Sequence, residues 1–364
     1  MYNPRYWRNS LVWMGRLSVI AFPILWRLKM NKIDEIYELT HKHRELYSAV
    51  FELTTCCNWR CKHCYIPEHI EKGLSLEQIN EVFDELRENG LFEITLTGGE
   101  IFARNDILEI IKLARNHFFK VILFSNISLL DEEKIVELSN LGVAEVSCTV
   151  FSLDEKIHDE ITGVNGSLQM VLKNLMLLKK HGLKVVIKSI IMKDNANEWR
   201  ELYEFCEKNG FRFMIDHDVF IKRDGTTSPY DCRVTREQFK RNCKEYDMLR
   251  NFKPRQHDEN EYVCGGIQNA IFIDSKGVVY PCNKFLLPLG NLFEEKLEDI
   301  WNKSEVLKRI QEMRWKDLKK CNKCKKSAFC IHCPGTALAE DGSEYACSSL
   351  AEEKAEIRQE VYAL

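Results

Sequence analysis

Short apolar runs alternate with longer segments of helical spacing over residues 33–216. In the segment 76–89, for example, Ile79, Val82 and Leu86 fall on one face of a helix. The alternation predicts strands at 49–53, 93–97, 120–125, 144–150, 184–191 and 211–216. It predicts helices at 33–47, 76–89, 107–118, 131–140, 168–181 and 197–209. Alternation of this kind is typical of parallel β/α units in a barrel-like or doubly wound sheet.

The pattern changes in the C-terminal part of the chain. Residues 217–262 are dense in charge, contain one predicted helix at 235–249, and are interpreted as a bridge. Later elements are predicted at 270–273 and 278–280, which form a hairpin, and at 297–313, which forms a helix. The predicted units are an N-terminal extension (1–47), a barrel (48–216), the bridge (217–262), a cysteine-rich domain (263–350) and a helical tail (351–364).

The N-terminal extension contains an apolar segment at 11–30 that resembles a signal peptide. Arg16 and Pro23 interrupt it, and no small-residue cleavage site follows. Its longest uncharged piece, 17–26, is too short to span a bilayer. We therefore expect an amphipathic helix that packs on the protein or contacts a membrane surface or a partner.

Composition limits the class of protein. A chain of 364 residues has room for two domains, or for one barrel with an extension. The net charge of −3 gives no basic field of the kind that binds nucleic acid, so we expect no nucleic-acid partner. The 15 cysteines are clustered, and the chain is too long for a small disulfide scaffold. Cofactor ligation in a cytoplasmic protein explains them better.

The first cysteine cluster directly follows the first predicted strand. Cys57, Cys61 and Cys64 are spaced C-x3-C-x2-C within one short loop. Thiolates select zinc, copper(I) or iron–sulfur clusters. A structural zinc site takes four protein ligands, whereas three cysteines leave one iron of a four-iron cluster open.

The segment 54–65 resembles the signature of the radical S-adenosylmethionine (SAM) enzymes. This resemblance implies a partial (β/α)6 TIM-like barrel, in which the amino and carboxylate groups of SAM chelate the open iron. Thr97-Gly98-Gly99-Glu100, at the end of the second strand, is similar to the motif that binds the SAM amino group. The cofactor-binding candidates are His63, Gly98, Gly99, Glu100, Asn126, Thr149 and Lys188.

The partner of the SAM carboxylate departs from the family pattern. Related enzymes often have an arginine a little after a His-Asp pair, and here Thr162 follows His158-Asp159. Lys188, on the fifth strand, is a possible substitute. The alternative is that Lys188 is an ordinary solvated lysine.

Seven further cysteines lie between Cys264 and Cys347. Paired Cys-x2-Cys spacing is also that of a zinc ribbon. Together with the first loop, however, these cysteines resemble the SPASM extension, which holds two auxiliary [4Fe-4S] clusters. The resemblance assigns the first cluster to Cys264, Cys282 and Cys333. It assigns the second to Cys321, Cys324, Cys330 and Cys347.

The first auxiliary set is one ligand short, because Ala270 stands where some relatives have a cysteine. Either one iron is open for substrate, or Cys232 or Cys243 completes the set. Cys232 or Cys243 could also give a hydrogen atom to a substrate radical, as a thiol does in related peptide epimerases. The alternative for both, and for Cys56, Cys148 and Cys206, is an inert buried thiol.

The resemblance implies that an electron from the reduced cluster cleaves SAM to methionine and a 5′-deoxyadenosyl radical. The radical then takes a hydrogen atom from a substrate. The favoured substrate is a ribosomally made peptide, which would be crosslinked or epimerised; a sugar or other small metabolite is the enzymatic alternative. Asn283, after Cys282, disfavours sulfatase maturation, since related enzymes have an aspartate there as base.

The expected partners are an electron donor such as flavodoxin or ferredoxin and a separate leader-binding protein. The non-enzymatic alternative is a zinc-stabilised interaction protein.

Overall fold

The structure is a computed structural model that describes residues 33–363. The apolar segment predicted as an amphipathic helix at 11–30 lies outside these residues. Over 33–363, no helix is both long enough and apolar enough to cross a membrane.

The six predicted strands and the helices between them are present, with ends that differ by a few residues. The strands are β1 (Ser48–Glu52), β2 (Glu93–Thr97), β3 (Lys120–Ser125), β4 (Glu145–Thr149), β5 (Val185–Ile190), β6 (Arg212–Asp216), β7 (Ala270–Ile273), β8 (Val278–Tyr280) and β9 (Gly290–Asn291). The helices of the N-terminal part are α3 (Ile33–His43), α4 (Leu76–Glu88), α5 (Ile107–Asn116), α6 (Glu132–Asn140), α7 (Glu155–Thr162), α8 (Ser167–Lys180) and α9 (Trp199–Asn209). The C-terminal part has α10 (Arg236–Leu249), α11 (Leu297–Lys303), α12 (Glu305–Glu312), α13 (Pro334–Asp341) and α14 (Ser349–Tyr362).

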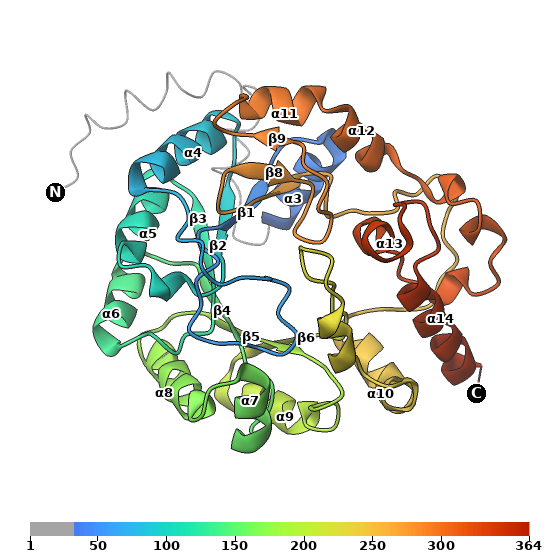
Figure 1. The fold of residues 1–364 in the computed structure, drawn as a ribbon, viewed down its shortest axis with the longest axis horizontal. Helices are drawn as coiled ribbons and strands as arrows, with labels where there is room; N and C mark the ends of the chain where they lie inside the picture. Colours follow the sequence, from blue (N-terminus) through green and yellow to red (C-terminus); the bar gives the residue numbers. More distant parts are fainter. Residues whose placement is uncertain (1–32, 364) are drawn as a thin grey trace.

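All nine strands form one sheet in the order β6-β5-β4-β3-β2-β1-β7-β8-β9. The strands from β6 to β7 are parallel, and β8 and β9 are antiparallel additions. Figure 1 shows the sheet curving inside a ring of helices that includes α4, α5, α6, α8 and α9. The predicted partial (β/α)6 barrel with a cysteine-rich C-terminal domain is confirmed.

The core lies between the sheet and its surrounding helices. In β3, Val121 and Leu123 are fully buried against this core, while Ile122 and Phe124 are half-buried on the opposite face. Because successive strand residues point to opposite faces, Ile122 and Phe124 line the inside of the curved sheet. The strands therefore give one face to the helices and one to the barrel interior.

Two local expectations for the chain were wrong. The predicted helix at 297–313 is two helices, α11 and α12, because the backbone of Ser304 is extended and its hydroxyl caps the start of α12. The segment after β4 contains an unpredicted helix, α7. Its N-cap Asp154 accepts from the backbone N–H of Ile157, and Gly163 ends it in a left-handed conformation.

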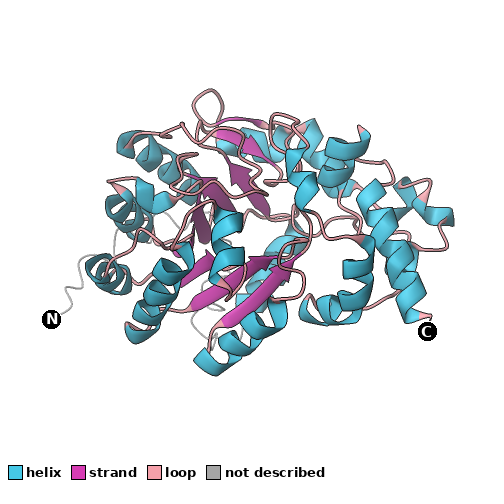
Figure 2. Ribbon diagram, turned by 60° about the horizontal axis from the view of Figure 1, so that its bottom comes forward, coloured by secondary structure: helices cyan, strands magenta, loops and turns pink. Residues whose placement is uncertain are grey.

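The sheet crosses the predicted domain boundary at residue 263. β7 pairs in parallel with β1, with Ser48 opposite both Ala270 and Glu93. The hairpin of the cysteine-rich domain therefore extends the barrel sheet. In Figure 2, the helices near the C-terminus lie to one side of the strands.

A buried ion pair joins the barrel to the bridge. Arg223 donates two hydrogen bonds, of 2.7 and 2.6 Å, to the carboxylate oxygens of Glu52, the last residue of β1. The Glu52 side chain is fully buried, and that of Arg223 is 18% exposed. The guanidinium also lies over the rings of Tyr65 and Phe272. Four segments distant in the sequence thus meet at Arg223.

Replacement of Arg223 by methionine should destabilise the protein strongly, because it leaves the Glu52 carboxylate buried without its cation. The expected loss is roughly 3–5 kcal/mol in the free energy of unfolding, measured by denaturant titration. The E52Q/R223M double variant should recover part of this loss.

The matched control is R255M, which breaks the exposed Arg255–Glu261 pair and should cost about 1 kcal/mol or less. Equal losses for R223M and R255M would contradict a special role for the buried pair.

Candidate functional site

The first cysteine loop follows β1, at the carboxyl end of the parallel strands. Cys57, Cys61 and Cys64 are partly exposed, and all three are free thiols. Burial raises the pKa of Cys57 to about 11, and the neighbouring charges of Glu100 and Cys64 add to this. The pKa of Cys61 is also raised, by burial and by Cys64 and Cys57. Close thiols of this kind are expected to be bound by a metal centre that stabilises their thiolates.

Gly98 and Gly99 let the β2 loop lie directly against the cysteine loop. A Cβ on Gly98 would lie 2.4 Å from the Thr54 carbonyl oxygen, and one on Gly99 would lie 2.4 Å from that of Cys56. The backbone N–H groups of Gly99 and Glu100 donate to the same two carbonyls, each at 2.8 Å. These glycines therefore position the cysteine loop as well as any ligand beside it.

Glu100 is directed into the protein. Its fully buried carboxylate accepts hydrogen bonds from the Ser125 hydroxyl (2.7 Å), the Asn126 N–H (2.6 Å) and the Phe102 N–H (3.0 Å). Burial raises its pKa in spite of these bonds. Three of its roughly four acceptor sites are thus occupied by the protein, and the carboxylate fixes the end of β3 beside the cysteine loop.

Asn126 lies next to the first cysteine. Its side-chain amide donates to Asn58 at 2.9 Å and lies 4.0 Å from the Cys57 sulfur. The Asn126 side-chain oxygen accepts from the N–H and the hydroxyl of Ser128. This network fixes the amide orientation of Asn126 beside the cysteine loop.

Thr149 and Lys188 are paired in register on β4 and β5. The Lys188 ammonium lies 3.3 Å from the centre of the Phe124 ring, on the inner face of the sheet. Burial lowers the pKa of Lys188 to about 8, although the charge of Glu145 opposes this. Lys188 is therefore not an ordinary solvated lysine; it is a cation in the barrel interior.

Thr162 ends α7 and is completely buried. Its hydroxyl lies 2.8 Å from that of Ser167, and its carbonyl accepts from the Arg60 N–H at 2.9 Å. The Lys62 N–H donates to the Ile161 carbonyl in the same way. These two hydrogen bonds therefore hold the backbone of the cysteine loop against the end of the unpredicted helix α7.

His63 is half-buried within the loop, and desolvation of its ring lowers its pKa to about 4. Its ring packs on Phe151, with centroids 5.1 Å apart. Among residues 33–363, its Nδ1 and the Trp59 Nε1 are buried polar atoms that have no hydrogen-bond partner. Orphaned groups of this kind beside three thiols fit a site that is completed by a cofactor.

A cavity of about 510 Å³ opens beside the same loop. Cys61 and Cys64 line it, together with the basic side chains of Arg60, Lys62 and Lys222. The Cys64 sulfur lies 3.5 Å from Nε2 of His69, which also lines this cavity. Neither His69 nor Lys222 belongs to a recognisable motif, so sequence reasoning did not predict them as site residues.

The C-terminal cysteines lie in two groups of neighbouring thiols. Burial and the neighbouring thiols of Cys333 and Cys264 raise the pKa of Cys282 to about 11. In the second group, the pKa of Cys330 is raised to about 12 by burial and by its neighbours Cys321, Cys347 and Cys324.

Gly335 brings the first group together. A Cβ at Gly335 would lie 2.7 Å from the Lys284 carbonyl oxygen, so the start of α13 can approach the turn after Cys282 only with glycine there. Cys333 is the N-cap residue of α13 and is therefore held near Cys282.

The arrangement of the cysteine sulfurs can be compared with that of a zinc site. Four thiolates bound to zinc at 2.3 Å would lie about 3.8 Å apart. Nowhere in 33–363 do three cysteine sulfurs lie within 4.8 Å of one another. Within residues 33–363, the cysteines therefore do not form a preformed zinc site.

The structure does not bring Cys243 to either group. It lies on α10, fully buried with Phe239 and Tyr246, and its thiol bonds to Asp247. Cys232 is buried in a small apolar cluster with Phe151, and Cys61 packs against that cluster. Of the two, only Cys232 is therefore near a predicted cluster, and that cluster is the SAM-binding one.

Comparison with known proteins agrees with this geometry. Residues 51–206 match the radical SAM superfamily, and residues 264–325 match the iron-sulfur cluster-binding domain named SPASM. The chain is 25% identical to an AdoMet-dependent heme synthase of Oleidesulfovibrio alaskensis, over 81% of this chain and 84% of that protein.

Two further proteins resemble the chain. It is 28% identical to the antilisterial bacteriocin subtilosin biosynthesis protein AlbA of Bacillus subtilis, over 78% of this chain and 66% of AlbA. The crystal structure of Streptococcus suis SuiB bound to precursor peptide SuiA superposes with a TM-score of 0.66 at 18% identity, covering 88% of this chain and 80% of SuiB. The similarity to SuiB concerns the fold alone.

The two matched domains, located where the cysteine groups lie, show that the chain belongs to the radical SAM superfamily and carries a SPASM domain.

Proposed function

We propose that this protein is a radical SAM enzyme that modifies a ribosomally made peptide. The observation that carries the proposal is the arrangement of ten cysteines in groups of three, three and four, the first of them at the carboxyl end of a parallel barrel. Active sites of such barrels lie at this end. The family membership makes the first group the SAM-binding site.

The chain's residues have distinct tasks in this site. Cys57, Cys61 and Cys64 would hold three irons of a [4Fe-4S] cluster, which supplies, when bound, the electron that cleaves SAM to a 5′-deoxyadenosyl radical. The half-buried ring of His63 and the fixed amide of Asn126 would contact the cofactor. The barrel wall around Phe124 and Thr149 would keep water from the radical.

Lys188 is proposed to bind the SAM carboxylate in place of the family's arginine. Its ammonium is the cation that the structure places on the inner face of β5. A charge-assisted bond of this kind is stronger in a partly buried site than in water.

The seven C-terminal cysteines are proposed to hold two auxiliary [4Fe-4S] clusters that exchange electrons with the substrate. The set of Cys264, Cys282 and Cys333 would then have one open iron, because Cys243 lies elsewhere and Cys232 lies in the apolar cluster that Cys61 contacts. Cys232 remains the candidate hydrogen donor on the side of the SAM cluster.

The substrate class is proposed from the relatives. AlbA is named for the biosynthesis of a bacteriocin, and SuiB was crystallised with a precursor peptide. The heme synthase similarity favours a second candidate, an enzyme that oxidises a small molecule. We also propose a cytoplasmic location, flavodoxin or ferredoxin as the electron donor, a separate leader-binding protein, and contact of the N-terminal segment with a membrane surface.

The first prediction concerns SAM cleavage. Anaerobically reconstituted protein with dithionite and SAM should produce 5′-deoxyadenosine, and the Cys57/Cys61/Cys64 triple alanine variant should produce none. The matched control is Cys56→Ala in the same loop, because the Cys56 thiol only donates to the Glu71 carbonyl. Equal yields from wild type and the triple variant would contradict the proposed radical site.

The second prediction concerns Lys188. Lys188→Met should weaken SAM binding by roughly tenfold or more at pH 7, measured by anaerobic calorimetry. Because the pKa of Lys188 is about 8, its ammonium is present below pH 8 and is lost as the pH rises through that value. The ratio of the two dissociation constants should therefore approach one near pH 9.

The control for this experiment is Lys184→Met, which changes an exposed lysine just before β5 and should bind SAM as the wild type does. A ratio that does not change with pH would assign the effect of Lys188→Met to packing.

The third prediction concerns the substrate. A short peptide encoded beside this gene should lose two hydrogen atoms on crosslinking, or take up deuterium from heavy water on epimerisation, as measured by mass spectrometry. In the second case, Cys232→Ala should abolish deuterium uptake and Cys243→Ala should not. Turnover of a small metabolite with no change in any such peptide would favour the second candidate function.

A further inference from the structure

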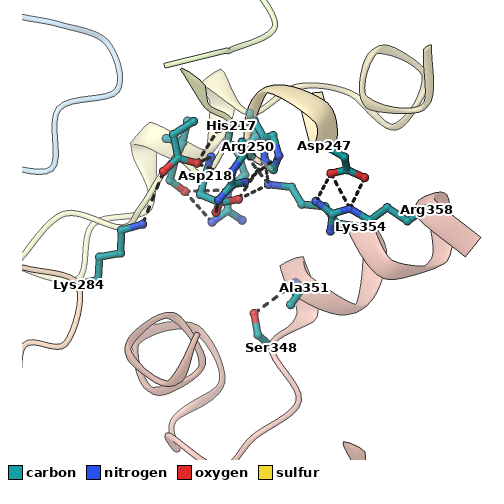
Figure 3. Close-up of polar contacts among 12 residues, drawn as sticks. His217, Asp218, Asp247, Arg250, Lys284, Ser348, Ala351, Lys354 and Arg358 are labelled. Atoms are coloured by element: carbon teal, nitrogen blue, oxygen red, sulfur yellow. Dashed lines mark hydrogen bonds and ion pairs between the residues drawn. The ribbon is translucent and has the colours of Figure 1, made fainter. Parts of the chain in front are cut away.

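A network of buried charges lies between the end of β6 and the C-terminal helix α14 (Figure 3). Asp216, His217 and Asp218 bring three possible metal-ligating atoms within 4.8 Å of one another. Cations of the protein already contact this group. Lys354 forms an ion pair with Asp218, Arg250 lies 3.6 Å from Asp216, and Lys284 lies 3.7 Å from Asp216. The group is therefore a protein charge network and not a metal site.

Lys354 is the central cation of this network. Its side chain is 8% exposed, and its ammonium lies 2.8 Å from Nδ1 of His217 and 3.0 Å from the His217 carbonyl. Although burial disfavours the charged form of Asp218, the Lys354 ammonium holds the pKa of that carboxyl well below its usual range. The pair is thus ionised within the protein interior.

His217 contributes no charge of its own. Its imidazole lies between Lys354 and Arg250, with the Arg250 nitrogen 2.9 Å from Nε2. Burial, together with the charge of Lys354, lowers its pKa to about 4. His217 is therefore neutral at pH 7.

The network holds an excess of positive charge. Arg358, one helical turn after Lys354 on α14, forms a buried ion pair with Asp247 at 2.9 Å. Four cations, Lys284, Arg250, Lys354 and Arg358, thus face three carboxylates, Asp216, Asp218 and Asp247. Lys354 and Arg358 are buried, whereas Arg250 and Lys284 are 21% and 30% exposed. An excess cation in such a network is stabilised by a nearby anion.

The first auxiliary cluster, if held by its cysteine group as proposed, would be that anion. Lys354, Arg250 and Arg358 line a small cavity together with Cys333. Its volume of about 30 Å³ has room for only one or two waters, so little solvent separates the cations from this cysteine.

A four-iron cluster held by three thiolates is negatively charged and gains one more negative charge on reduction. A nearby buried cation stabilises the reduced form more than the oxidised form, and the low local dielectric strengthens the effect. We propose that Lys354 is a positioning residue that raises the reduction potential of the first auxiliary cluster, so that this cluster accepts an electron from the substrate. This inference rests on the auxiliary clusters proposed above.

The test is a potentiometric titration of the anaerobically reconstituted full chain, followed by electron paramagnetic resonance. The signal of the first auxiliary cluster is identified by its loss in Cys264→Ala. Lys354→Met should lower the midpoint potential of that signal. The expected change in the reduced-to-oxidised ratio at a fixed potential is about tenfold, which corresponds to about 59 mV.

Asp218→Asn gives a prediction of the opposite sign. It removes a negative charge from the same network and should raise the potential of the first auxiliary cluster. The D218N/K354M double variant restores the net charge and should have a potential near that of the wild type. If Lys354→Met alone fails to fold, these variants still test whether the charge network sets the cluster potential. Lys354→Arg keeps the positive charge and should retain the wild-type potential.

The matched control is Lys240→Met. Lys240 also joins α10 to α14, through an exposed ion pair with Glu360 at 2.8 Å, and its loss should leave every potential unchanged. Wild-type potentials in both Lys354→Met and Asp218→Asn, with full iron content, would overturn the inference. The titration requires no SAM cleavage, so a failure of the proposed radical chemistry would be recognised separately.

Discussion

The ion pair of Glu52 and Arg223 is the contact on which the arrangement of the site depends. Glu52 ends the strand that leads into the cysteine loop, and Arg223 comes from the bridge after the last barrel strand. The guanidinium also covers Tyr65, directly after Cys64, and Phe272 of β7. A fully buried carboxylate requires a well-placed cation. The pair therefore fixes the barrel, the loop, the bridge and the C-terminal hairpin relative to one another.

The cysteine loop is positioned mainly through its backbone. The N–H groups of Gly99 and Glu100 donate to its carbonyls from the β2 side, and α7 accepts hydrogen bonds from the N–H groups of Arg60 and Lys62. This leaves the thiols and the His63 ring to contact a cofactor. The same logic explains Glu100, whose carboxylate ties the β2 loop to the end of β3. Rigid loops on a parallel barrel are well suited to hold a reactive intermediate.

The C-terminal helix α14 joins the cysteine-rich domain to the barrel by charge. Lys354 and Arg358 lie on its buried face and pair with carboxylates after β6 and on α10. Buried ion pairs contribute little net stability compared with apolar contacts of the same size. Here they place positive charge near Cys333, because Lys354 and Arg358 line a cavity of about 30 Å³ together with that cysteine.

The sequence by itself determined the features that depend on local spacing. The alternation of strands and helices predicted the barrel, and the spacing of Cys57, Cys61 and Cys64 predicted the cluster loop. Only the tertiary structure decided which cysteines lie together and that Lys188 faces the barrel interior. It also decided that Cys243 lies away from both C-terminal cysteine groups. So were the pairs Glu52–Arg223 and Asp218–Lys354, whose partners lie 171 and 136 residues apart. The reason is that a charged residue on a polar helix gives the same sequence pattern whether it faces water or a buried partner, and only the folded chain brings that partner to it.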